Sequence, residues 1–165
     1  MAISAAPNPA STRESFEIMD LTFKPADAAD EDAVAALWRE CGLTVPYNDP
    51  AADFRFALGR EASDVLVARE GGRQTGRIVA SVMVGHDGHR GWLYYVAVDP
   101  MLQRQGVGAR IVAAGEEWLK ARGVVKVQLL VRETNTRVVA FYEKLGFEIA
   151  PRVVMAKWID GRDVP

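Results

Sequence analysis

The sequence has 165 residues, enough for one domain with a sizeable core and too few for two ordinary domains. Hydrophobic residues make up 49% and charged residues 25%, as in globular proteins, and no apolar run approaches the roughly 20 residues of a membrane helix. The net charge of −2 with scattered basic residues argues against nucleic acid, and a single cysteine, Cys41, argues against a disulfide or a multi-thiolate metal site. We therefore expect a cytoplasmic protein without metal, membrane or nucleic-acid partners.

The first half of the chain predicts a leader, a strand and two helices. Residues 1–17 are rich in Ala, Ser and Pro and lack the apolar region of a secretory signal, so we expect a disordered leader. A short strand over 19–24 precedes a helix whose apolar residues, from Val34 to Cys41, recur at helical spacing until Gly42. Asp49 is expected to cap a second helix that begins at Pro50.

The second half alternates between strand and helix periodicity. Residues 64–70 and 75–85 predict a hairpin, and 92–98 predict a further strand. A helix over 107–122, a strand over 124–131, a helix over 135–146 and two short strands within 147–159 follow. This order predicts an α/β (α+β) fold, a mixed and mostly antiparallel sheet of about seven strands with helices on both faces. We expect one domain over 18–160 and a tail over 161–165.

Two glycines, Gly106 and Gly108, stand where the helix after Pro100 begins. A helix start exposes unpaired N–H groups at the positive end of the helix dipole, and glycines let an anion approach them. A tight turn is the alternative interpretation. The dinucleotide fingerprint fails because Ile111 replaces its third glycine, and no G-K-[ST] of a P-loop occurs. The pattern therefore predicts a different phosphate ligand.

Two separate segments resemble the GNAT superfamily of N-acetyltransferases. Gln103, Gly106 and Gly108 match its Q/R-x-x-G-x-G/A motif, and "NTRVVAFYEKLGFE" resembles its second conserved segment, departing only at Val138. The resemblance covers roughly residues 18–158. The stretches "YNDP" and "HDGHRG" further resemble the bacterial YpeA-like subgroup.

The resemblance implies that acetyl-CoA is the co-substrate. Its pyrophosphate would lie on the amides of the glycine loop, and its pantetheine arm between two central strands that splay apart. The residues implied in cofactor binding are Val96, Ala97, Val98, Gln103, Arg104, Gln105, Gly106, Val107, Gly108, Ala109, Asn135 and Tyr142. Asn135 is alternatively a helix N-cap.

The resemblance also assigns Tyr142 as the catalytic acid beside the CoA sulfur, because a phenol with a pKa of about 10 is protonated at neutral pH. The alternative is a core aromatic beside Phe141. No general base can be assigned. The candidates are mainly expected to be solvated, capping or turn-forming residues: Asp87, Asp99, Glu133, His86 and His89.

Acceptor recognition is expected in the early helix-loop-helix, at Tyr47, Asn48 and Asp49, where a cap and a turn explain the same residues equally well. The predicted function is N-acetylation of a primary amine of a small molecule or peptide, by direct attack on the thioester. A non-catalytic acyl-CoA sensor is the alternative, and the protein is expected to be a monomer or homodimer.

Overall fold

The strands of the sheet lie in the order in which they occur along the chain. The computed structural model describes residues 20–162. Five strands occur there: β1 (Phe23–Pro25), β2 (Ser63–Arg69), β3 (Ile78–His86), β4 (Gly91–Val98) and β5 (Val127–Gln128). The pairs from β1 to β4 are antiparallel, and β5 lies parallel to β4. The predicted mixed, mostly antiparallel sheet is confirmed, with fewer strands than the seven or so expected.

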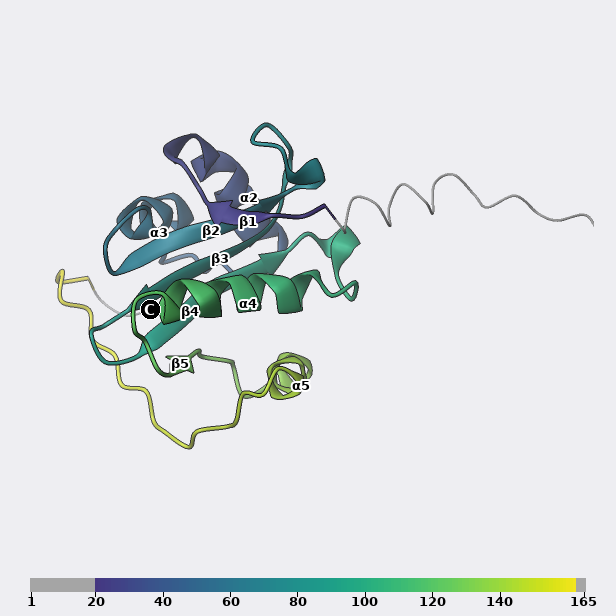
Figure 1. Cartoon of the computed structure of the whole chain (residues 1–165). Helices are drawn as coiled ribbons and strands as arrows, with labels where there is room; N and C mark the ends of the chain where they lie inside the picture. Colours follow the sequence, from purple (N-terminus) through teal and green to yellow (C-terminus); the bar gives the residue numbers. More distant parts are fainter. Residues whose placement is uncertain (1–19, 163–165) are drawn as a thin grey trace, which may run out of the picture. The chain divides into compact units, whose positions relative to one another are not determined.

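Helices cover both faces of this sheet. The helices α2 (Glu31–Glu40) and α3 (Pro50–Ala57) lie behind it in Figure 1, and α4 (Val107–Lys120) crosses the near face. Short 3-10 turns occur at η1 (Ala28–Asp30), η2 (Glu70–Gly72) and η3 (Pro100–Leu102). Ser81 of β3 accepts a hydrogen bond from Trp38 of α2, whereas its neighbour Val82 faces α4. Successive strand residues point to opposite faces, so both layers are anchored on β3.

The core between α2, α3 and the sheet is built around Trp38. This side chain is fully buried, stacks on Tyr95 with ring centroids 4.1 Å apart, and lies 6.4 Å from the Phe54 ring. Its indole N–H donates to the buried hydroxyl of Ser81 at 2.9 Å, so the one polar atom of the ring is satisfied. A helix on this face is therefore fixed to both β3 and β4 through one residue.

The described residues form two compact units, with the boundary between Leu130 and Val131. The second contains α5 (Thr136–Lys144), capped by Asn135, and the predicted helix is confirmed. Residues 147–159 form no strand, although their apolar pattern predicts two. A strand needs a partner ladder, Pro151 has no N–H to donate, and several apolar side chains here are exposed: Ile149, Val153, Val154, Met155 and Ile159.

The predicted leader, residues 1–17, lies outside the described residues, as do Met19 and the last three residues of the predicted tail. The assignment of 18–160 to one domain stays a prediction. The strand predicted over 124–131 is shorter than expected, because only Val127 and Gln128 pair with β4.

Candidate functional site

The start of α4 presents N–H groups that its N-cap residue does not satisfy. Gly106 is the N-cap and has φ 83°, in the left-handed region that glycine adopts at no steric cost, and Arg104 also has a positive φ of 63°. The caps of α3 and α5, Asp49 and Asn135, instead each accept a hydrogen bond from a first-turn N–H. The first turn of α4 is therefore available to water or an anionic ligand at the positive end of the helix dipole.

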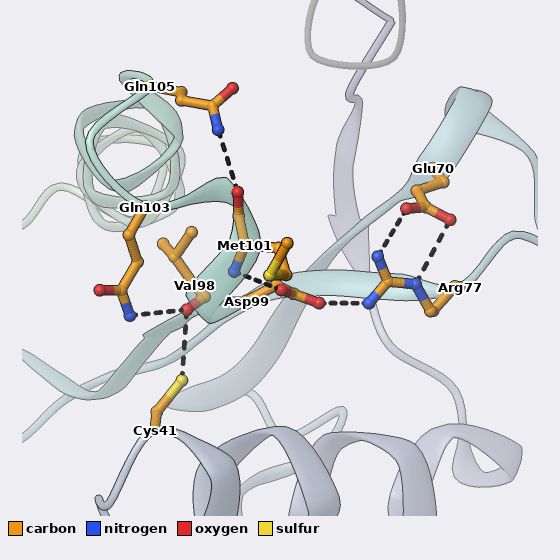
Figure 2. Close-up of polar contacts among 8 residues, drawn as sticks. All are labelled: Cys41, Glu70, Arg77, Val98, Asp99, Met101, Gln103 and Gln105. Carbon is orange, nitrogen blue, oxygen red and sulfur yellow. Dashed lines mark hydrogen bonds and ion pairs between the residues drawn. The ribbon is translucent and has the colours of Figure 1, made fainter. Parts of the chain in front are cut away.

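Glutamine side chains brace the loop before this helix. Gln103 Nε2 donates to the carbonyl of Val98 at 3.2 Å, and Gln105 Nε2 donates to the carbonyl of Met101 at 3.0 Å (Figure 2). The Val98 carbonyl also accepts from the Cys41 thiol at 3.3 Å. Burial raises the pKa of this thiol, which favours a packing role over a nucleophilic one.

Asp99 anchors the junction between β4 and η3. One of its carboxylate oxygens accepts from the Met101 N–H at 2.8 Å, and the other pairs with Arg77, which also binds Glu70 (Figure 2). The two carboxylates raise the pKa of Arg77 above its ordinary value. Because Asp99 is buried and both of its oxygens are engaged, its position supports the structural interpretation over a general base.

The outer edge of β4 offers unpaired strand backbone. β5 pairs with β4 only at Gly91 and Trp92, so within the described chain residues 93–98 have no β5 partner. The Asp99 N–H bonds to Val79 of β3, and peptide groups alternate in direction, so Val98 and Val96 direct their N–H groups away from β3. The early end of the β4–β5 ladder agrees with the splaying that was predicted for the two strands.

A bulge interrupts β4 beside this edge. Tyr94 stands opposite Met83 and Ala97 opposite Ser81, so two residues of β4 face one residue of β3. Tyr95, the first of the two, has φ 48°, which is uncommon for a residue with a side chain. The bulge places the Tyr94 and Tyr95 side chains on one cavity.

We call the cavity lined by Tyr94 and Tyr95 the acceptor cavity. It has a volume of about 480 Å³ and lies on the side of the sheet covered by α2 and α3. Its apolar lining comes from the loop after α2, from α3 and from β3: Leu43, Val45, Phe56, Ala57 and Met83. Its polar lining is Asn48, Asp53, Tyr94 and Tyr95. The volume suits a small molecule or a terminal side chain.

Asp53 and Tyr95 form a hydrogen-bonded pair in the acceptor cavity. The Tyr95 hydroxyl donates to Asp53 Oδ2 at 2.7 Å, and burial and the Asp53 carboxylate raise the Tyr95 pKa to about 12. Neither residue was predicted from the sequence to take part in the site. Asp53 could have been recognised because it lies one helical turn before Ala57, which is buried, so it had to approach the covered face of α3.

The three residues predicted to contact the acceptor have different surroundings. Asn48 lines the acceptor cavity. Asp49 accepts from the Ala51 N–H at 2.9 Å, which confirms its capping role. Tyr47 is 47% exposed and is not among the cavity-lining residues. Acceptor binding by all three stays a prediction.

The hairpin loop between β3 and β4 has a structural explanation. Asp87 accepts hydrogen bonds from the N–H groups of His89 and Arg90 and from the Trp92 indole. These donors lower the Asp87 pKa to about 2. A carboxylate held in this way closes the turn, as expected for a polar loop residue.

Two residues predicted to act in cofactor binding and catalysis, Asn135 and Tyr142, lie in the second unit, and these two roles stay predictions. Asn135 accepts from the Val138 N–H at 3.3 Å, so it caps α5 as the alternative interpretation held. Tyr142 is buried, and its ring makes edge contacts with Phe141 and Phe147. Burial raises its pKa to about 12, so the hydroxyl stays protonated at neutral pH.

Within residues 20–162, no helix combines the length and the apolar character that a membrane crossing needs. Over the same range, no three side chains of the His, Cys, Asp and Glu types gather in a way that could hold a metal ion.

Comparison with known proteins gives concordant matches. The model of the acetyltransferase (GNAT) family matches residues 30–147. An acetyltransferase of Pectobacterium atrosepticum is 40% identical over 128 residues, which cover 78% of this chain and 88% of the relative. An acetyltransferase of Yersinia enterocolitica is 38% identical over 129 residues, covering 78% and 89%.

Solved structures agree. The ribosomal-protein-S18-alanine N-acetyltransferase of Escherichia coli superposes with a TM-score of 0.67 at 27% identity, covering 86% of this chain and 87% of that one. An aminoglycoside N-acetyltransferase solved in complex with CoA gives a TM-score of 0.70 at 17% identity, over 84% and 95% of the two chains, which supports the fold alone.

Proposed function

The chain belongs to the acetyltransferase (GNAT) family, as its two motifs predicted, and from this premise we propose that it transfers an acetyl group from acetyl-CoA to a primary amine. The acceptor is a small molecule or the amino group of a peptide. The observation that carries the proposal is the left-handed Gly106 at the uncapped start of α4, since a helix start of this kind suits a pyrophosphate.

The proposed cofactor contacts are mainly backbone contacts. The N–H groups from Arg104 to Ala109 would hold the pyrophosphate, because the side chains of Gln103 and Gln105 are engaged in bracing the loop. The free N–H groups of Val96 and Val98 would bond to the pantetheine arm as to an added strand. One of them would donate to the oxygen of the thioester as negative charge develops there.

In the proposed reaction the neutral amine attacks the thioester carbonyl carbon, a C–N bond forms, and the C–S bond breaks to release CoA thiolate. The nitrogen loses one proton to solvent, and the acid that protonates the thiolate regains its proton from solvent. Tyr142 is proposed as the acid that donates to this thiolate. Its raised pKa supports the role, because the phenol keeps its proton throughout the neutral range. We also propose a cytoplasmic location, which the free thiol of Cys41 supports.

A screen for CoA release over amines, amino acids and peptides tests the proposed function. We expect release with at least one primary amine, and we expect Tyr142→Phe to lower kcat at least tenfold with little change in acetyl-CoA affinity. Phe retains the aromatic ring, so its packing against Phe147 is the control for structure. Acetyl-CoA binding without CoA release on any acceptor would favour a sensor, and unchanged turnover in Tyr142→Phe would remove this residue from the acid role.

A further inference from the structure

We propose that the acceptor cavity binds its amine as an ammonium ion on the Asp53 carboxylate, and that its acceptors carry a single positive charge on an apolar or aromatic body. The inference rests on the proposed function and names the substrate class of that site. It is carried by the charges, contacts and exposure of the cavity residues.

The charge of the acceptor cavity comes from one carboxylate. Asp53 is the one charged side chain among the cavity-lining residues, and the others are apolar, amide or phenol groups. A lone carboxylate in such surroundings attracts a cation, because the partly apolar walls screen its charge less than water does. It compensates one positive charge and leaves any further charge of a polyamine without a partner.

One of the two carboxylate oxygens of Asp53 is engaged by a neighbouring side chain. Tyr95 donates to Oδ2 at 2.7 Å. Within residues 20–162, no hydrogen bond reaches Oδ1, and no Lys or Arg forms an ion pair with Asp53. An ammonium group carries three N–H donors and can bind Oδ1 while Tyr95 keeps Oδ2. The pair is therefore a preformed receptor for one ammonium ion.

Packed elements hold both Asp53 and its partner Tyr95. The Tyr95 ring is stacked at 4.1 Å on the fully buried Trp38, and its backbone is fixed at the bulge with φ 48°. Asp53 itself lies in the first turns of α3, and its N–H bonds to the Asp49 carbonyl at 3.0 Å. Both partners are thus positioned by packed elements, and Tyr95 acts as a positioning residue for the carboxylate.

Aromatic side chains line the acceptor cavity together with Asp53. Phe56 and Tyr94 line the acceptor cavity and are 83% and 44% exposed, and Trp92 stacks beside Tyr94 with centroids 6.2 Å apart. Exposed aromatic rings next to a carboxylate suit an apolar carrier, and their faces attract the ammonium as well. A carboxylate on the acceptor, as in a free amino acid, would be repelled by Asp53.

Calorimetry on the full-length chain saturated with CoA tests the inference. The ligands are 2-phenylethylamine with one positive charge, spermidine with several, and phenylalanine with an added carboxylate. We expect 2-phenylethylamine to bind at least tenfold more tightly than the other two. A peptide amide with an N-terminal phenylalanine presents the same ammonium and apolar body, and its affinity relative to 2-phenylethylamine tells whether the amine comes from a peptide or a free molecule.

Variants separate charge from structure. Asp53→Asn should weaken 2-phenylethylamine binding at least tenfold, and Asp32→Asn, the same change at an exposed carboxylate of α2, should leave it unchanged. Tyr95→Phe keeps the ring on Trp38 and removes the hydroxyl. It should raise KM for the amine several-fold with a smaller change in kcat, and it should leave acetyl-CoA affinity unchanged.

Equal binding by Asp53→Asn and the wild type would overturn the inference, and so would a preference for spermidine or phenylalanine. Failure of the proposed function gives a different result. If 2-phenylethylamine binds through Asp53 but no CoA is released from acetyl-CoA, acetyl transfer is refuted and the ammonium site stands. If amines are acetylated and Asp53→Asn acts like the wild type, transfer stands and the ammonium site is refuted.

Discussion

Replacing Gly106 with alanine tests whether the start of α4 binds an anion, because the same helix offers a matched control at its other end. Gly106 and Gly123 have φ values of 83° and 78°, and a Cβ added at either position meets no atom within 4 Å. Gly106 is the N-cap of α4, whereas Gly123 follows its last turn, with its N–H bonded to the Lys120 carbonyl. The two substitutions therefore differ in position and not in strain.

The expected loss of stability is the same for both variants. Holding a residue with a Cβ in the left-handed region costs about 1–2 kcal/mol. In a chain of this size each kcal/mol lowers the melting temperature by about 2–4 °C, so we expect a fall of about 2–8 °C for each variant. Thermal unfolding without ligand measures this shift.

Acetyl-CoA affinity should separate the two variants. In Gly106→Ala the new methyl group would lie beside the first-turn N–H groups and hinder the approach of the anion. Alternatively, the loop would relax, and returning the substituted residue to the left-handed conformation would then reduce the free energy of binding. A penalty of about 1.4 kcal/mol raises Kd tenfold, so we expect at least about a tenfold rise for Gly106→Ala and none for Gly123→Ala. Calorimetry gives both values. Equal affinities in the two variants would refute the assignment of this helix start to the pyrophosphate.

Three further predictions concern the glycine loop before α4, the core and the stability at alkaline pH. Gly108→Val should abolish acetyl-CoA binding in the same calorimetric assay, because its side chain would fill the proposed pyrophosphate position; retained affinity would mean that the turn is only structural. Trp38→Phe should lower the free energy of unfolding by about 2–4 kcal/mol, since it shrinks the core and leaves the buried Ser81 hydroxyl without its donor; a urea titration showing no loss would contradict this. The pKa values of Tyr95 and Tyr142 are raised from 10.0 to about 12, so the stability they contribute is fully present below pH 10 and is lost as the pH rises to about 12. Unfolding measured across that range should show a smaller fall in the Tyr95→Phe, Tyr142→Phe double variant.

Elements with strong local signals could be predicted from the sequence. Asp49 before Pro50 marks the start of α3, and the change of period after Pro100 marks α4. The absence of strands over residues 147–159 could not be predicted in this way, because the alternation of apolar and polar residues does not show whether a partner strand exists. The predicted strand over 124–131 shrinks to Val127 and Gln128 for the same reason.

The candidate site shows the same division between local and long-range information. Gly106 is readable because its left-handed conformation is a local property of one loop. The bulge at Tyr95 could not be predicted from "WLYYVAV", because this pattern is typical of a regular strand. A bulge depends on the register of β4 with β3. The hydrogen-bond partner of Asp53, Tyr95, lies 42 residues away along the chain, so no short sequence motif predicts the pair.

The bulge in β4 directs the backbone and the side chains of one short segment, residues 95–98, to two different sites. Backbone N–H groups of Val96 and Val98 face the open edge, where the cofactor arm is proposed, while the Tyr95 side chain faces the acceptor cavity. Substitutions at Val96 or Val98 that preserve the strand should therefore have little effect on cofactor binding, because the backbone makes the contact. A change at Tyr95 acts through Asp53 on the acceptor instead. Donor and acceptor recognition can thus vary independently, although they are separated by a single residue along the chain.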